Sequence, residues 1–340
     1  MTATKIEKYD YPFEHYMIEN FLPEESFKII YKKYSKTKFY QKYTDLFSFY
    51  QSDEIRATKE FGLFFKNLDN IFNQVDETKD YWYNGFCSYY NEGDYLLCHD
   101  DRVEFRKYAF SFYLEDFDSG ELMLYNEDFS DKKILKVRRN VLVIFRVSDV
   151  SFHEVNYCFT SGRKAITGWF NTKDSLFNDN QGKERNILQK IAEENMVELE
   201  IYPNNKFTSL PNMIYEYEII DSKEEIPFTN RRMLKLSLRD PLLIKIKGYT
   251  LMHYSFYKVR KFDYLLLNDP INNLESENIL DLFCFHGKNR NLVFLDEEGN
   301  EVNRIIVNDG SWLVERNGMK FFVENGIDEF FMAHFIYLKE

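Results

Sequence analysis

The stretch Cys87-Ser-Tyr-Tyr-Asn-Glu-Gly-Asp-Tyr-Leu-Leu-Cys-His-Asp-Asp101 decides how this chain is organised. Its Asn-Glu-Gly segment predicts a turn, and the apolar run after it predicts a short strand. His99 and Asp101 stand two residues apart, and side chains two apart on a strand point to the same face. This spacing predicts two metal ligands side by side, with Asp100 facing away.

The segment 141–170 supplies the other candidates for this site. His153 follows an apolar run, and Arg163 opens a second apolar strand ten residues later. Two histidines and one carboxylate form the facial triad that leaves positions open on Fe(II) for a co-substrate and O2. A guanidinium on an inner strand is an uncompensated buried charge unless an anion meets it, and arginine grips a carboxylate with two parallel hydrogen bonds. Arg163 is therefore the candidate anchor for a dicarboxylate that chelates the metal.

Each of these residues also has a plainer interpretation. A lone His-x-Asp pair is more often a solvated turn, and His153 alone is more often a core histidine bonded to a neighbour. Arg163 could form a salt bridge with an acidic side chain. Tyr90, nine residues before His99, could donate its hydroxyl to the distal carboxylate or simply pack in an aromatic run. Arg163 shifts the balance toward the metal site, because a guanidinium on an inner strand needs an anion and a metal-bound dicarboxylate supplies one.

Composition predicts a globular protein in a reducing compartment. The chain has 340 residues, of which 44% are apolar, and this length favours two domains. Four cysteines without a CxxC pair indicate buried thiols, and no apolar stretch is long enough to cross a bilayer. The first residues do not resemble a signal peptide, so we expect a cytoplasmic or nuclear location, or both. A net charge of −12 counts against direct nucleic-acid binding and is compatible with a basic polypeptide as partner.

The order of apolar patterns predicts a mostly β chain with flanking helices. One helix is expected to start at Pro23, and a second to cover Phe61–Gln74. From Tyr81 to Phe170 short strands alternate with turn signals, as in a double-stranded β-helix, the cupin-like jelly roll. We expect residues 1–180 to form this metal-binding domain, and a linker with a helix to occupy 181–197.

Residues 198–340 are expected to form a second, degenerate double-stranded β-helix. The segment Asp94-Tyr-Leu-Leu-Cys-His-Asp-Asp101 recurs as Asp263-Tyr-Leu-Leu-Leu-Asn-Asp-Pro270, with five of eight positions identical. In the second copy Asn268 takes the position of His99, and Pro270 that of Asp101. The echo indicates a duplicated barrel that has lost its ligands.

These motifs together resemble the 2-oxoglutarate and Fe(II)-dependent oxygenases of the prolyl hydroxylase type. The resemblance rests on Tyr90-x-x-Gly93, His99-x-Asp101, a Gly-Glu-Leu strand, His153 and Arg163. More specifically, Leu-Leu-Cys-His-Asp-Asp-Arg, Phe-Tyr-Leu, Val-Ser-Phe-His-Glu-Val and Gly-Trp-Phe resemble the ribosomal prolyl 3-hydroxylase branch. That branch often has two glycines before the Glu-Leu strand, where this chain has Ser119-Gly120. It also carries a second, non-catalytic double-stranded β-helix domain.

The resemblance implies a peptidyl-proline 3-hydroxylase. Such an enzyme would hydroxylate a prolyl residue of a small-subunit ribosomal protein at the decoding centre and release succinate and CO2. It implies that His99, Asp101 and His153 bind Fe(II), and that Arg163 and Tyr90 bind 2-oxoglutarate. O2 would be the co-substrate and ascorbate the reductant, and the C-terminal domain would contact translation factors.

Two other functions are compatible with the same residues. One is a non-catalytic protein that keeps the fold, senses O2 or 2-oxoglutarate by binding it, and docks a partner. The other is a nucleic-acid demethylase with the same cofactors, which would need a basic groove that the acidic balance does not favour.

Overall fold

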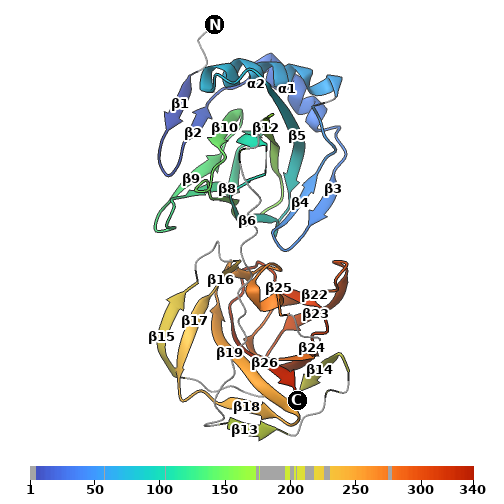
Figure 1. Cartoon of the computed structure of the whole chain (residues 1–340). Coiled ribbons are helices and arrows are strands. Elements are labelled where there is room, and N and C mark those ends of the chain that lie inside the picture. Colours follow the sequence, from blue (N-terminus) through green and yellow to red (C-terminus); the bar gives the residue numbers. More distant parts are fainter. Residues whose placement is uncertain are drawn as a thin grey trace. The chain divides into compact units, whose positions relative to one another are not determined.

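A computed structural model of the chain describes residues 5–56, 58–103, 105–173, 176, 196–199, 203, 205–210, 218–225, 230–274 and 278–340. It divides into two compact units, residues 1–181 and 182–340 (Figure 1). The predicted linker helix, 184–195, lies outside the described residues. None of the described helices is long and apolar enough to cross a membrane.

The first unit combines two α-helices with one large sheet. Both predicted helices are present, although the first begins at Glu24 and Pro23 takes the capping position before it. Glu24 and Glu25 lie in its first turn, where carboxylates complement the helix dipole. The elements are β1 (Ile6–Tyr9), β2 (His15–Ile18), α1 (Glu24–Tyr34), β3 (Tyr40–Tyr43), β4 (Phe47–Gln51), α2 (Gly62–Val75), β5 (Tyr81–Tyr90), β6 (Tyr95–His99), β7 (Arg106–Tyr113), β8 (Phe117–Tyr125), β9 (Lys132–Val137), β10 (Val141–Arg146), β11 (His153–Val155) and β12 (Arg163–Thr172), with a 3-10 turn at Lys59–Phe61.

The sheet of the first unit curls so that its two halves face each other. Its strand order is β1-β2-β10-β7-β12-β5-β4-β6-β11-β8-β9, and all neighbours are antiparallel. Strand β4 pairs with both β5 and β6 and so joins the two halves. The sequence-based prediction of a mostly β jelly roll with flanking helices is confirmed for this unit.

Alternation along the strands separates a helix-covered face from an inner face. Phe110 and Phe112 of β7 belong to a core cluster with α2 side chains such as Phe64 and Phe72. Ala109 and Tyr113 of the same strand belong to a second cluster between the two halves of the sheet. Each fully buried phenylalanine contributes roughly 1.5–3 kcal/mol. The helices therefore stabilise the sheet from outside and leave its inner face for a site.

The second unit is built from two main sheets and one short strand pair. The orders are β14-β24-β21-β26-β19-β17-β15 and β16-β20-β25-β22-β23, and β13 pairs with β18. Its described strands are β13 (Met196–Leu199), β14 (Phe207–Leu210), β15 (Glu218–Glu224), β16 (Arg231–Arg232), β17 (Leu234–Arg239), β18 (Leu243–Ile246), β19 (Tyr249–Val259), β20 (Tyr264–Leu265), β21 (Ile279–Gly287), β22 (Arg290–Leu295), β23 (Glu301–Val307), β24 (Gly310–Glu315), β25 (Lys320–Val323) and β26 (Phe330–Lys339), with a 3-10 turn at Pro270–Asn272.

Strand order repeats between the two units. The run β10-β7-β12-β5 of the first unit corresponds to β24-β21-β26-β19 of the second, and β6-β11-β8-β9 corresponds to β20-β25-β22-β23. The registers also agree, because Arg163 pairs with Tyr90 where Phe330 pairs with Val259. The predicted second double-stranded β-helix stays a prediction, which this order and register support.

Candidate metal centre and its pocket

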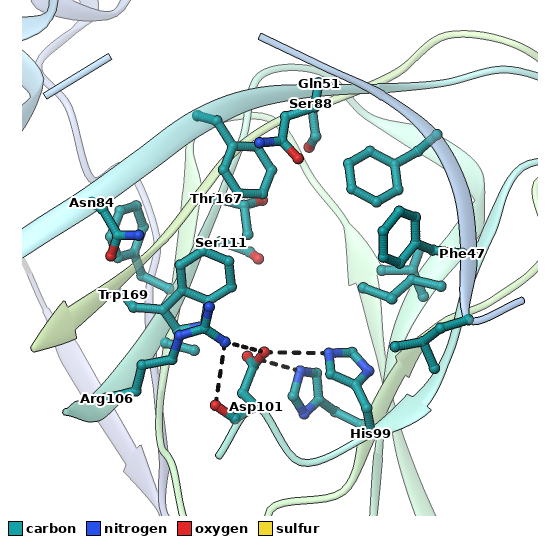
Figure 2. Close-up of a pocket in the computed structure, with 18 of the residues that line it drawn as sticks. Phe47, Gln51, Asn84, Ser88, His99, Asp101, Arg106, Ser111, Thr167 and Trp169 are labelled. Atoms are coloured by element: carbon teal, nitrogen blue, oxygen red, sulfur yellow. Dashed lines mark hydrogen bonds and ion pairs between the residues drawn. The ribbon is translucent and has the colours of Figure 1, made fainter. Parts of the chain in front are cut away.

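The two histidines of the candidate site face each other across neighbouring strands. His99 ends β6, His153 begins β11, and they are direct partners in the antiparallel ladder. Their ring centroids lie 4.3 Å apart. The carboxylate of Asp101 lies 3.4 Å from each Nε2 (Figure 2). Among the described residues, these three form a group whose ligand atoms all lie within 4.8 Å of one another.

Backbone carbonyls orient both imidazoles for metal binding. The Nδ1 of His99 lies 2.8 Å from the carbonyl oxygen of Leu97, and the Nδ1 of His153 lies 2.8 Å from that of Ser151. A carbonyl only accepts hydrogen bonds, so each Nδ1 carries the proton and each neutral ring keeps a lone pair on Nε2. Histidines that bind metal commonly have their second nitrogen fixed in this way.

Asp101 reaches the site by a backbone reversal and not by strand alternation. Strand β6 ends at His99, and Asp101 has φ of 61°, in the left-handed region that aspartate tolerates better than most residues. The prediction that His99 and Asp101 share one face of a continuous strand was therefore wrong in its premise, although both side chains do point to the same place. Asp100 turns to the surface, where Arg102 Nε donates to it over 2.7 Å.

The pKa values of His99 and Asp101 are shifted in opposite directions. Burial lowers the pKa of His99, but the hydrogen bond and charge of Asp101 outweigh burial, so the pKa lies above its ordinary value. Burial raises the pKa of Asp101, and the hydrogen bonds and charges of His153 and His99 more than reverse this, which holds its pKa well below 3.8. The carboxylate is therefore ionised at neutral pH, as a metal ligand must be.

Arg163 lies deep in a cavity of about 520 Å³ that the three side chains also line. The arginine is 2% exposed, and its Nε donates to the carbonyl oxygen of Gly120 over 2.7 Å. No carboxylate among the residues described in the first unit lies within 4.0 Å of its guanidinium. A buried guanidinium without an anionic partner is costly, so the cavity is suited to an anion at this end. The salt bridge considered as the plainer interpretation of Arg163 is therefore not formed with any residue that the structure describes.

Two tyrosines lie beside the guanidinium of Arg163. Its central carbon lies 4.7 Å from the ring centroid of Tyr90 and 5.3 Å from that of Tyr113. The role of Tyr90 as a hydroxyl donor stays a prediction, because the contact observed is between its ring and the guanidinium. Sequence reasoning missed Tyr113, whose fully buried hydroxyl makes no hydrogen bond in the described structure. Tyr113 shares strand parity with Ser111, which lines the cavity, but only the structure shows that this face of the strand is the inner one.

The family comparison covers these strands. Residues 86–171 match the 2OG-Fe(II) oxygenase superfamily. This stretch of the first unit is similar to a 2OG-Fe(II) oxygenase domain. The matched stretch spans β6 to β11 together with the second half of β5 and nearly all of β12, and so contains His99, Asp101, His153 and Arg163. Iron(II), 2-oxoglutarate and O2 are the cofactors and co-substrate that this family uses.

Curated relatives of the 2OG-Fe(II) oxygenase domain are prolyl hydroxylases. Prolyl 3-hydroxylase OGFOD1 of Xenopus laevis is 35% identical over 182 residues, which cover 47% of this chain and 35% of the relative. Prolyl 3-hydroxylase OGFOD1 of Mus musculus is 36% identical over 182 residues, with 47% and 33% covered. The chain thus matches about a third of the length of these relatives. A solved Pseudomonas putida prolyl-4-hydroxylase has 16% identity and a TM-score of 0.41, covering 47% of this chain and 92% of that chain.

Proposed function

We propose that the protein is a 2-oxoglutarate- and Fe(II)-dependent dioxygenase that hydroxylates a prolyl residue of a protein substrate. The observation that carries the proposal is the convergence of His99, Asp101 and His153 on one point of a cavity whose inner end is the guanidinium of Arg163. The names of the curated relatives support proline as the target.

The three side chains fit Fe(II) in the type of their donor atoms and in the orientation of their imidazole rings. Two neutral imidazole nitrogens and one carboxylate form the facial set that non-haem Fe(II) prefers. Both Nδ1 atoms are already engaged, so His99 and His153 offer only Nε2. Each Nε2 lies 3.4 Å from an Asp101 oxygen, so all three side chains direct their ligand atoms to the same point, where an ion would bind them together.

The inner end of the cavity fits the distal carboxylate of 2-oxoglutarate. Arg163 presents its guanidinium beside Tyr90 and Tyr113, and a bidentate carboxylate would compensate the buried charge. Gly120 approaches closely enough that a β-carbon there would lie 2.7 Å from Cδ of Arg163, so the glycine leaves room for the arginine side chain.

The remaining lining orients the substrate and limits water. Bound Fe(II), together with 2-oxoglutarate and O2, supplies the oxidising power that hydroxylates an unactivated C–H bond. Phe47, Phe49 and Phe145 form an apolar wall beside the two histidines, which excludes water from the reacting atoms. Trp169 and Asn84 line another part of the cavity, where a protein side chain would be held.

We further propose that the substrate is a small-subunit ribosomal protein of the decoding centre, that ascorbate maintains the reduced metal, and that the second unit binds translation factors. The resemblance to the ribosomal prolyl 3-hydroxylase branch supports these assignments. The net charge of −12 suits a basic substrate such as a ribosomal protein. We also propose a cytoplasmic or nuclear location, which agrees with a ribosomal protein as the substrate.

The test is turnover by the purified full chain. Fe(II), 2-oxoglutarate and ascorbate are supplied with a proline-containing peptide of the decoding-centre ribosomal protein, and succinate and peptide mass are followed. We expect succinate and a mass gain of one oxygen on proline, both abolished by a chelator. A methylated single-stranded oligonucleotide serves as the comparison substrate.

Three outcomes would count against the proposal. Oxidation of the oligonucleotide in place of the peptide would favour a demethylase. Tight peptide binding without Fe(II)-dependent succinate would favour a non-catalytic sensor. Unchanged succinate formation in a His153→Ala variant would move the metal away from the assigned site. Mass spectrometry of ribosomal proteins from cells with and without the protein then identifies the substrate.

A further inference from the structure

Arg106 connects a metal-ligand candidate to the wall of the cavity. It opens β7, lines the cavity, and has a side chain that is 22% exposed. Its guanidinium carbon lies 3.7 Å from the ring centroid of Trp169, which fixes the group against an aromatic face. Nη1 contacts both the carbonyl oxygen of Asp101, at 3.3 Å, and its Oδ1, at 3.4 Å (Figure 2).

These contacts matter because Asp101 has little other support. It lies beyond the end of β6 in a left-handed conformation, so no strand ladder holds its backbone. Its carboxylate otherwise contacts only the Nε2 atoms of His99 and His153 among the described residues, and an ion would occupy those nitrogens. The contacts to Arg106 are the ones that an ion leaves in place.

We infer that Arg106 is a positioning residue that holds the Asp101 carboxylate in the orientation in which it binds the metal. The inference rests on the proposed function, since it needs a metal at the three side chains. Arg106 grips the main chain and the carboxylate of one residue and is itself held by Trp169. It thereby fixes both the backbone reversal and the direction of the ligand oxygen.

Two effects of the guanidinium oppose each other. Its positive charge repels a divalent cation, which weakens metal binding. Its two contacts pre-order a carboxylate that would otherwise rotate, which strengthens metal binding, and loss of such outer contacts typically lowers metal affinity 10–100-fold. Pre-ordering is the larger effect here because Asp101 adopts a backbone conformation that most residues avoid.

The experiment measures binding of Mn(II) alone to the full chain, read from the electron paramagnetic resonance signal of the free ion. Arg106→Met keeps an unbranched apolar stem but removes the guanidinium, and with it the charge, the donors and the contact with Trp169. We expect its Mn(II) affinity to fall about 10–100-fold. Arg106→Lys keeps one donor and the charge, and should recover part of the loss.

Arg102→Met is the matched control. Arg102 lies in the connection between β6 and β7 and also lines the cavity, but its Nε donates to Asp100 and not to Asp101, so its loss should leave Mn(II) affinity within about twofold. The free energy of unfolding of each metal-free variant is measured alongside. A structural role alone would lower that stability without changing the Mn(II) affinity of the folded protein, and this pattern would overturn the inference.

The remaining outcomes separate the inference from the proposed function. If wild type and His153→Ala bind Mn(II) equally weakly, the metal site fails and the inference fails with it. If wild type binds and His153→Ala does not, the site stands, and equal or tighter binding by Arg106→Met overturns the role of Arg106 alone.

Discussion

His99 and His153 are direct cross-strand partners, and their ring centroids lie 4.3 Å apart. Each ring has its Nδ1 bonded to a carbonyl of its own strand or of the loop before it. The pair therefore presents two Nε2 atoms to one point, which Asp101 reaches from the following turn.

Replacing His153 by alanine should abolish Fe(II)-dependent succinate formation. The variant loses one of two imidazoles, and the two remaining ligands hold Fe(II) too weakly for turnover. His153 is 4% exposed and its ring makes a hydrogen bond with the carbonyl of Ser151, so we expect the free energy of unfolding to fall by about 1–3 kcal/mol. Succinate release and chemical denaturation measure the two effects. Unfolding of the variant at room temperature would leave the loss of turnover uninformative, and His99→Ala then takes its place, because His99 is less buried.

Replacing Arg163 by methionine should weaken 2-oxoglutarate binding by about 100-fold, since truncating one partner of a buried charge pair typically costs 2–5 kcal/mol. Arg163→Lys should lose less, because the ammonium keeps the charge but not the bidentate fork. The dependence of succinate release on 2-oxoglutarate concentration measures both. An unchanged KM for 2-oxoglutarate in Arg163→Met would place the co-substrate elsewhere.

Arg163→Met should change the stability of the protein much less than it changes 2-oxoglutarate binding. Arg163→Met removes a hydrogen bond to Gly120, but it also removes a buried charge without an anionic partner. We therefore expect the free energy of unfolding to stay within about 1 kcal/mol of wild type. Urea denaturation measures the free energy of unfolding. A loss of several kcal/mol would contradict the prediction, because it would mean that Arg163 stabilises the fold as a salt-bridge partner would.

Gly120→Ala should damage both stability and 2-oxoglutarate binding. Gly120 has φ of 62°, and a β-carbon there would lie 2.5 Å from Sγ of Cys158 and 2.7 Å from Cδ of Arg163. We expect a loss of about 1–3 kcal/mol and a higher KM for 2-oxoglutarate, because the arginine must move. Gly62→Ala is the control, since nothing lies within 4 Å of its added β-carbon, and it should be neutral or stabilising by up to about 1 kcal/mol. Equal effects of the two substitutions would contradict the packing argument.

The second unit should lose stability in mildly acidic solution through His253. Burial, followed by the nearby positive charges of His334, Lys235 and Arg231, lowers the pKa of His253 from 6.5 to about 4. The unfolded chain then binds more protons between those values, so this contribution to stability is complete above about pH 6.5 and is lost as pH falls toward 4. His253→Gln can keep the hydrogen bond to Ser255 but does not titrate. Thermal unfolding from pH 7 to pH 4 should show a steeper decline for wild type, and parallel curves would contradict the prediction.

Much of the fold could be predicted because its patterns are local. Alternating apolar residues between Tyr81 and Phe170 predicted the strands of the first unit, and helical spacing predicted α2 to within one residue at each end. The repeat of Asp94 to Asp101 at 263–270 predicted a second barrel, and the strand order of the second unit agrees with it. The apolar run Leu242–Tyr249 by itself predicts one strand, but a turn after Ile246 separates β18 from β19.

By itself, the sequence determined the kinds of ligand and their number. The imidazole, carboxylate and guanidinium groups can be read directly from the sequence. So can their spacings, which indicate which of them lie on strands. Only the tertiary structure decided how these groups meet, because the pairing register of β6 with β11 sets the distance between His99 and His153. The same holds for the left-handed turn at Asp101 and its contact with Arg106, since both depend on loop geometry and packing that no periodicity encodes.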